Sequence, residues 1–292
     1  MAYSFRHSDK CVEAGLKRIA GSQIDKALDE FDNRGRAEAV HQVRKRCKKL
    51  RGLLRLVRPH FPDYKEENAA FRDAARLLSP IRDRAAMIEA FNRIAVRFED
   101  KIDTHALAPI REQLGAARRD PDDDETERLE RFRAAMVEAR ERAEGWSLDR
   151  DGPKTFEGGV EKTYARAVDA MAEAHDKRTG DALHEWRKRV KYHWYHARLL
   201  KRGRKDLLDE EADAAGDLSD ILGDHHDIVV FEVEIESGAL KAEGPDGELF
   251  RGLLKTRRAT LEEKAFAKGA LVCSEKPKNL AKRWAGYWRT SD

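Results

Sequence analysis

Apolar residues recur at helical spacing along most of the chain, and residues that break helices separate these stretches. We expect breaks near Asn33-Arg34-Gly35, Pro59 to Pro62, Asp120-Pro121, Gly152-Pro153, Gly180, Gly203, Gly244 to Gly247 and Pro277. Segment 228–236, IVVFEVEIE, alternates apolar residues with Glu as a strand would, but one strand without a partner cannot form a sheet. We therefore expect a helix there and an all-α fold.

One segment of the chain occurs twice. HQVRKRCKKLRGLLRLV (41–57) reappears 143 residues later as HEWRKRVKYHWYHARLL (184–200), with seven identical positions. A shorter match, LSPIRD (78–83) with LGDHHD (222–227), pairs Asp83 with Asp227 and Arg82 with His226, and we expect a turn at each. This self-similarity predicts two related, pseudo-symmetric helical bundles, residues 1–150 and 151–292, with a boundary in the loop around residues 147–154.

On a helical wheel each copy of the repeat has an apolar face and a cationic row. The apolar faces contain Val43, Cys47, Leu50, Leu53, Leu54 and Val57 in the first copy, and Trp186, Val190, Ala197 and Leu200 in the second. The rows contain His41, Arg44, Lys45, Lys48, Arg51, Gly52 and Arg55, and His184, Arg187, Lys188, Lys191, Trp194, Tyr195, Arg198 and Arg202. Cations at this spacing repel one another, so the rows predict a polyanionic partner: an external phosphate-rich ligand or the protein's own acidic segments.

Charge is abundant and unevenly distributed. The 58 Lys and Arg residues nearly cancel the 55 Asp and Glu residues, which leaves a formal net charge of +3. Residues 36–58 and 184–205 each carry +8, whereas residues 206–236 carry −12 and residues 120–130 carry −6. Because the blocks are segregated, local fields matter more to function than the total charge does. The 40% of hydrophobic residues is still enough for a packed core.

Several classes of protein are not expected. No apolar run approaches the roughly 20 residues that span a bilayer, and the first residues lack a signal-peptide core. Three widely spaced cysteines fit free thiols in a reducing compartment, so we expect a soluble cytoplasmic protein with no membrane partner. His193 and His196 fall toward the buried side of their helix and are interpreted as core histidines, and His225-His226-Asp227 does not make a metal site. Without an enzyme motif in the sequence, we expect no catalytic residue, cofactor or metal.

The repeated H-x-x-R-K-R-x-K segments, SPIRD, GDHHD and the tail EKPKNLAKRWAGYW resemble the CHAD family of conserved-histidine α-helical domains, which includes the phosins of polyphosphate granules. The resemblance implies that the basic faces line a shared groove or pore that binds inorganic polyphosphate, with the protein at the granules. It implies as ligands His41, Arg44, Lys45, Lys48, Arg55, His184, Arg187, Lys188, Lys191 and Arg198, and further Arg18, Lys162, Arg82, His226 and Lys276. Asp83 and Asp227 are expected to orient a neighbouring Arg or His.

Other functions remain as alternatives. The cationic rows would attract nucleic acid, although aromatic residues for base stacking are few beyond Trp194 and Tyr195. An enzyme that acts on phosphate chains, and internal pairing of the basic faces with the acidic block, are further alternatives. The ExExK strand of a companion CYTH module is not found, since 232–236 ends in Glu, and nothing in the sequence indicates an oligomeric state. For polyphosphate we expect binding that weakens with salt and strengthens as the pH falls through about 6.5, where histidine titrates.

Overall fold

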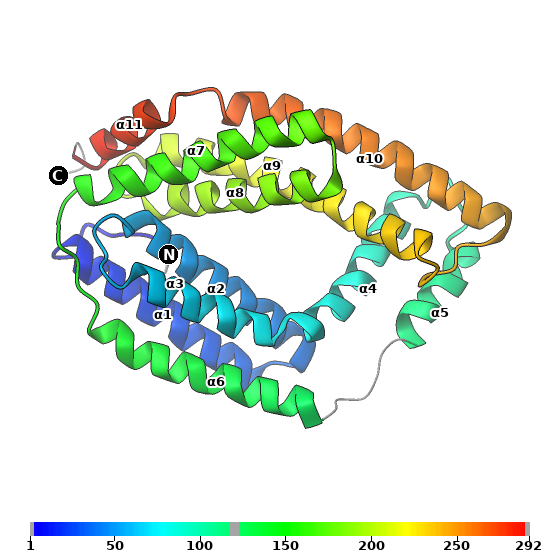
Figure 1. Ribbon diagram of the computed structural model, residues 1–292, viewed down its shortest axis with the longest axis horizontal. Coiled ribbons are helices and arrows are strands. Elements are labelled where there is room, and N and C mark those ends of the chain that lie inside the picture. The colour runs from blue at the N-terminus through cyan, green and yellow to red at the C-terminus, as the bar shows by residue number, and fades with distance from the viewer. Residues whose placement is uncertain (1–2, 117–122, 290–292) are drawn as a thin grey trace.

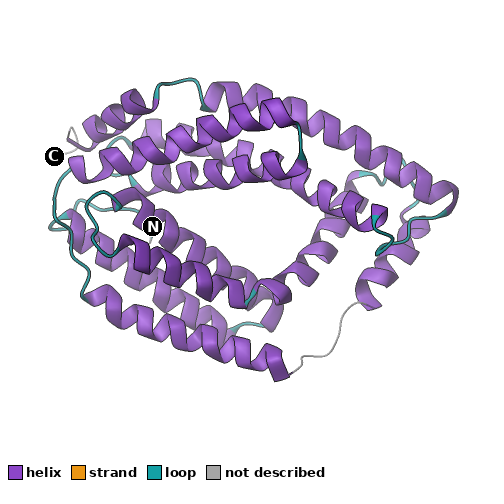
Figure 2. Cartoon of the chain, viewed as in Figure 1, coloured by secondary structure: helices purple, strands orange, loops and turns teal. Residues whose placement is uncertain are grey.

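The computed structural model describes residues 3–116 and 123–289, and these residues form helices and the loops that join them (Figure 2). The elements in chain order are α1 (Val12–Asn33), α2 (Arg36–Val57), α3 (Tyr64–Leu77), α4 (Ser79–Arg97), the short 3₁₀ helix η1 (Thr104–Leu107), α5 (Ala108–Ala116), α6 (Asp123–Glu144), α7 (Lys154–Lys177), α8 (Gly180–Leu199), α9 (Lys205–Glu236), α10 (Gly244–Val272) and α11 (Pro277–Arg289). The predicted all-α fold is confirmed.

Most helix ends fall at the predicted breaks. Helix α1 ends at Asn33 and α2 begins after Gly35, and a loop with two prolines separates α2 from α3. Pro277 is the first residue of α11, where its missing N–H costs nothing because that donor has no partner within the helix. Residues 228–236 lie in α9, so the helical interpretation of this segment is confirmed. The expected break at Asp120-Pro121 lies outside the described residues.

The expected turn at LSPIRD is limited to Leu78, which joins α3 to α4, and the expected turn at LGDHHD is wrong. SPIRD forms the first turns of α4, and GDHHD lies inside α9. In α9 the buried residues Leu218, Leu222 and Ile228 continue one apolar stripe past Gly223. Burial of that stripe outweighs the cost of one glycine in a helix, which is about 1 kcal/mol.

The helices are arranged in a ring, with α1, α2, α3 and α6 on one side and α7, α8, α9 and α11 on the other (Figure 1). The largest core cluster lies at the end of the ring where these two sides meet. It contains Leu54 and Trp146 from before the predicted boundary, and Phe156, Tyr164 and Trp284 from after it. The link from α6 to α7 runs through the predicted boundary, and residues of both sequence halves pack together in this cluster.

A second core cluster closes the opposite end of the ring. It packs Phe91 and Ile94 of α4 and Leu107 of η1 against Phe231 of α9 and Phe250 of α10. The second half of the chain thus contacts the first half at both ends, and the middle of the ring lies between α2 and α3 on one side and α8 on the other (Figure 1).

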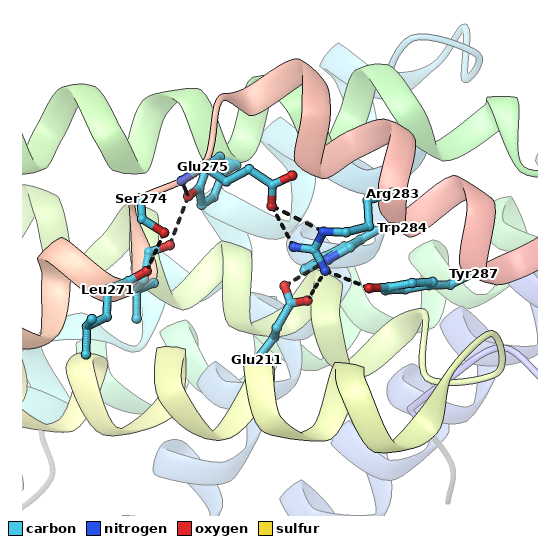
Figure 3. A network of polar contacts seen from close by, with 9 residues as sticks. Glu211, Leu271, Ser274, Glu275, Arg283, Trp284 and Tyr287 are labelled. Carbon is cyan, nitrogen blue, oxygen red and sulfur yellow. Dashed lines mark hydrogen bonds and ion pairs between the residues drawn. The ribbon is translucent and has the colours of Figure 1, made fainter.

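Helix α11 is fixed to this frame by Arg283 (Figure 3). The Arg283 guanidinium donates to Glu275 (Nη2 to Oε2, 2.7 Å) and to Glu211 of α9 (Nη1 to Oε1, 2.5 Å). The indole N–H of Trp284 donates to the other oxygen of Glu211 (2.9 Å). Trp284 and Trp288 are both buried, so α11 packs its tryptophans into the core.

Two glycines allow close approach of helices around α2. A Cβ at Gly159 of α7 would lie 1.8 Å from the carbonyl oxygen of Leu56, and one at Gly52 would lie 3.1 Å from the side chain of Tyr195 in α8. At the second crossing the ring of His196 also lies 3.1 Å (Nε2) from the Gly52 carbonyl. Small residues at these crossings bring α2 directly against α7 and α8, and so set the distance between the repeated segments.

Candidate functional site

A cavity of about 480 Å³ lies in the middle of the ring, between α2, α3 and α8, and we call it the basic cavity. It is lined by Arg44, Cys47, Lys48, Arg51, Arg55, Arg72, Ala75, Arg76, Ser79, Glu185, Arg187, Lys188, Arg189, Lys191, Tyr192 and Tyr195. Ten of these side chains are Lys or Arg, and one is a carboxylate. The apolar residues that the wheel assigned to the other face of α2 are buried, as are those of α8. Each repeated helix therefore packs one face in the core and turns cations toward the same space.

Neutral oxygens hold Arg51 and Arg55 of α2 in place, whereas Arg72 and Arg76 of α3 form ion pairs with Asp73. Arg55 donates to the side-chain oxygen of Asn68 (2.6 Å) and to the Arg51 carbonyl (3.0 Å), and Arg51 donates to the same Asn68 oxygen (3.2 Å). Amide and carbonyl oxygens orient a guanidinium without neutralising it, so these arginines keep their charge for an anion. Burial lowers the pKa of Arg55, with the Tyr192 phenol opposing and the Arg51 charge adding to that effect.

The two repeated arginines make corresponding contacts. Arg44 donates to the Ala75 carbonyl (2.5 Å) and to the Ser79 hydroxyl (2.7 Å). Arg187 donates to the Ser219 carbonyl (3.3 Å), and its guanidinium lies over Gly223, where a Cβ would be 3.1 Å from its Nε. Ser79 and Gly223 occupy the same place in the shorter sequence match. Arg44 of α2 thus contacts the first residue of SPIRD, and Arg187 of α8 lies against the first residue of GDHHD.

Lys191 lies on the α8 side among other cations. Its ammonium is 3.9 Å from the centre of the Trp194 ring and 3.9 Å from a carboxylate oxygen of the exposed Asp220. Burial lowers the pKa of Lys191 to about 8; Asp220 opposes this shift, whereas Arg187 and Lys45 add to it. The exposed Lys45 does not line the cavity but is close enough to act on Lys191. Such crowding of like charges is relieved when an anion binds.

The histidine of the second repeat forms a pair with His226. The ring centres of His184 and His226 are 3.9 Å apart, with an angle of 31° between the planes. Burial, the neighbouring imidazole and the charge of Lys188 lower the pKa of His184 to about 4, and burial and Arg187 lower the pKa of His226. The charge switch near pH 6.5 was expected for the two repeated histidines, and for His184 burial beside cations moves the pKa below that value. His41 lies near the start of α2 and is not among the residues that line the cavity.

Several predicted ligands lie away from the cavity lining. Arg18 donates to the buried carboxylate of Asp9 (2.6 Å). Lys162 is exposed on α7, and Lys276 is exposed between α10 and α11. Arg198 lies 4.7 Å from the centre of the Trp194 ring. Arg198 does not line the basic cavity either, but it shares the Trp194 ring with Lys191 and lowers the pKa of that lysine, so it lies close to the cavity wall.

Of the two predicted carboxylates, Asp83 and Asp227, the structure describes the side chain of Asp227. The side chains of Arg82 and Asp83, in α4, lie outside the described part of the structure. Asp227 forms an ion pair with Arg93 of α4 and also raises the pKa of His226 against the effect of burial. Asp227 therefore links α9 to α4 as well as lying beside the histidine pair.

The remaining histidine motifs belong to the core. His193 and His196 are buried, as expected, and the His193 ring stacks on Trp284 with ring centres 5.1 Å apart. His225 contacts Glu262 of α10 (Nε2 to Oε1, 3.0 Å), whereas His226 pairs with His184. Among the described residues, no three His, Cys, Asp or Glu side chains are grouped to hold a metal ion. Within the same residues, no helix is long and apolar enough to cross a membrane.

Sequence reasoning missed part of the cavity wall. Arg72 and Arg76 of α3, together with Arg189 and Tyr192 of α8, line the cavity but were not predicted as ligands. The spacing of Arg72 and Arg76, four residues apart, places them on one helix face, but the repeat does not include them. Tyr195, expected among the exposed aromatics, is buried at 2% exposure, because its ring packs under Gly52.

Comparisons with known proteins agree on the fold. A family model described as the CHAD domain matches residues 18–236. The crystal structure of the CHAD domain from the plant Ricinus communis has a TM-score of 0.60 and 15% sequence identity, and the match covers 92% of this chain and 94% of that chain. A comparison with curated proteins gave no match. Since the family model covers most of the chain, this protein belongs to the CHAD domain family.

Proposed function

We propose that this protein binds inorganic polyphosphate in the basic cavity and does not catalyse a reaction on it. The observation that carries the proposal is the charge of the cavity lining, with ten Lys or Arg side chains and one carboxylate around one open cavity. Arginine forks and lysine ammonium groups are the side chains that bind phosphate oxygens most strongly. The resemblance of the repeated motifs to the phosins supports the same ligand and, further, an association with polyphosphate granules.

The aromatic rings near the cavity favour a ligand made of phosphates over one that carries bases. Non-specific binding of single-stranded nucleic acid relies on aromatic faces on which bases can stack. Here Arg55 lies 4.1 Å above the ring of Tyr192, and Lys191 lies 3.9 Å from the ring centre of Trp194. Tyr195 is buried. The protein's own cations therefore cover the faces that bases would need.

Calorimetric titration with long-chain polyphosphate tests the proposal. We would compare the wild type with a variant in which three exposed lysines near the cavity are reversed, Lys45→Glu, Lys48→Glu and Lys188→Glu. The matched control reverses three exposed lysines on α10 and α11, Lys255→Glu, Lys264→Glu and Lys278→Glu. Both variants change the net charge equally, so a difference between them reports position and not total charge.

We expect binding by the wild type and the control and a loss of at least about 100-fold in the cavity variant, since each lost charged contact is worth about 1.5 kcal/mol or more. Equal binding by the two variants would contradict the site. Displacement of polyphosphate by duplex DNA at equal phosphate concentration would favour the nucleic-acid alternative. Release of orthophosphate with Mg²⁺ or Mn²⁺ present would contradict the non-catalytic part of the proposal.

A further inference from the structure

Glu185 is the one carboxylate among the described residues that line the basic cavity. Its two oxygens form ion pairs with Lys188 and Arg189, three and four residues further along α8. Both cations also line the cavity. Two of the ten positive charges are therefore already paired with a carboxylate of the protein that lies in the same space.

The first repeat lacks this carboxylate. The residue that corresponds to Glu185 is Gln42, and the counterparts of Lys188 and Arg189 are Lys45 and Arg46. Arg46 does not line the cavity; its guanidinium donates to Glu30 of α1 (Nε to Oε2, 3.0 Å). Arg46 of the first repeat thus links α2 to α1, whereas Arg189 of the second repeat faces the cavity and pairs with Glu185.

We propose that Glu185 acts as a tethered counter-ion, which competes with the bound polyanion for Lys188 and Arg189 and thereby lowers the affinity of the α8 side of the cavity. The proposal rests on the proposed function, because it assumes that a polyanion enters the cavity. A polyphosphate that contacts these two cations must displace Glu185 or tolerate its charge nearby. Cations that stay paired with Glu185 neutralise fewer phosphates, so fewer counterions leave the polyphosphate, and Glu185 also reduces the salt dependence of binding.

The ordinary alternative is a surface ion pair that supports the helix and has no effect on a ligand. Pairs of Glu with Lys or Arg three or four residues on are common on helices and contribute little to stability. Glu173 and Lys177 of α7 form such a pair on an exposed surface (2.7 Å). This pair provides a matched comparison, because Glu173→Gln and Glu185→Gln remove the same charge from the same kind of contact.

The experiment measures the affinity for long-chain polyphosphate as a function of salt for the wild type, Glu185→Gln and Glu173→Gln. Glutamine is the residue that the first repeat carries at this position, and it keeps the shape of the side chain. For Glu185→Gln we expect about tenfold tighter binding at low salt and a slope of log affinity against log salt that is more negative by about 1 to 2, since two cations are freed. Glu173→Gln should match the wild type in both quantities.

The possible outcomes separate this inference from the proposed function. If the wild type binds no polyphosphate, the proposed function fails. If the wild type binds and Glu185→Gln has the same affinity and slope, the tethered counter-ion is contradicted while the proposed function stands. Weaker binding by Glu185→Gln would contradict it too, because Glu185 would then position Lys188 and Arg189 for the ligand. A gain equal to that of Glu173→Gln would reflect net charge alone and would equally overturn the inference.

Discussion

At the scale of single residues, burial and crowding lower the pKa of two lysines in the repeated helices. Burial, with Arg46 and Arg198 adding to its effect, lowers the pKa of Lys49 to about 8, and Lys191 is lowered to a similar value. Burial also lowers the pKa of Arg55, but the intrinsic pKa of arginine is above 12, so its guanidinium stays charged. The arginines therefore keep a fixed charge over the physiological range, whereas these lysines titrate at its upper edge.

The first prediction concerns Lys191. Because its pKa is about 8 in the free protein, the ammonium loses its proton as the pH rises through that value, and an anion loses one charged contact. We expect the affinity for long-chain polyphosphate to fall by about tenfold between about pH 7 and pH 9, as the loss of one such contact would give. Lys191→Arg stays protonated and should bind almost equally at both values. The same pH profile in both proteins would assign the titrating group elsewhere.

The second prediction concerns the buried histidine His193. Burial, with a smaller contribution from Arg283, lowers its pKa to about 4. Between pH 6.5 and pH 4 the unfolded chain binds a proton that the folded protein does not, so stability falls as the pH falls through the unfolded value. Urea unfolding of His193→Phe should therefore lose about 2 kcal/mol less than the wild type between about pH 7 and pH 5. An equal loss in both proteins would contradict the neutral, buried state of His193.

At the scale of elements, the cavity depends on how closely the helices cross. Gly159 allows the backbone of α7 to contact the end of α2, and Gly52 allows α2 to contact α8. These contacts hold the repeated helices on opposite walls of the cavity, so their geometry affects the site without any contact to a ligand.

The third prediction is a pair of glycine substitutions. In Gly159→Ala the new methyl group would overlap the Leu56 carbonyl, and we expect a loss of about 2 to 3 kcal/mol in the free energy of unfolding. A methyl group on Gly252 of α10 would meet no described atom of another element within 4 Å, so Gly252→Ala should gain up to about 1 kcal/mol from helix propensity. Urea denaturation measures both. Similar effects of the two substitutions would mean that α7 and α2 are not in close contact at Gly159.

The local sequence predicted the helices themselves, but it did not predict which helices pack against one another. Spacing of apolar residues predicted the buried faces of α2 and α8, and glycine and proline predicted most helix ends. The repeat also identified the two helices that carry the cations. Periodicity reports one helix at a time, however, so it could not show that α3 brings Arg72 and Arg76 to the same cavity.

The same limit explains the errors in the predicted turn at LGDHHD and in the expected pKa of His184. GDHHD contains residues typical of turns, yet it continues a helix because the apolar stripe of α9 packs along its whole length. The pKa of His184 depends on burial against His226, which lies in a different helix. Such effects arise from tertiary contacts between residues that are distant in the sequence.

At the scale of the whole molecule, a near-zero net charge coexists with a strongly positive interior. The chain carries a formal charge of +3, but ten cations line the cavity in the middle of the ring. The acidic residues of α9 lie partly at the edge of this space, where Asp220 is 3.9 Å from Lys191. This segregation concentrates positive charge around the cavity.

The fourth prediction follows from that concentration of charge. By analogy with nucleic-acid binding, a polyanion that contacts six or more cations loses about 10³-fold in affinity between about 50 mM and about 200 mM salt. We expect a loss of this size for long-chain polyphosphate, measured by titration with labelled ligand. Short chains contact fewer cations and should show a shallower dependence. A shallow dependence for long chains as well would indicate that few of the cavity cations touch the ligand.

The most direct test of the central claim is a crystal structure of the protein with a polyphosphate of defined length. We predict continuous density for the phosphate chain in the basic cavity, within hydrogen-bond distance of Arg44 and Lys48 on α2 and of Arg187 and Lys191 on α8. Density on an outer surface, such as that around Arg18 or Lys162, with the cavity empty, would contradict the account.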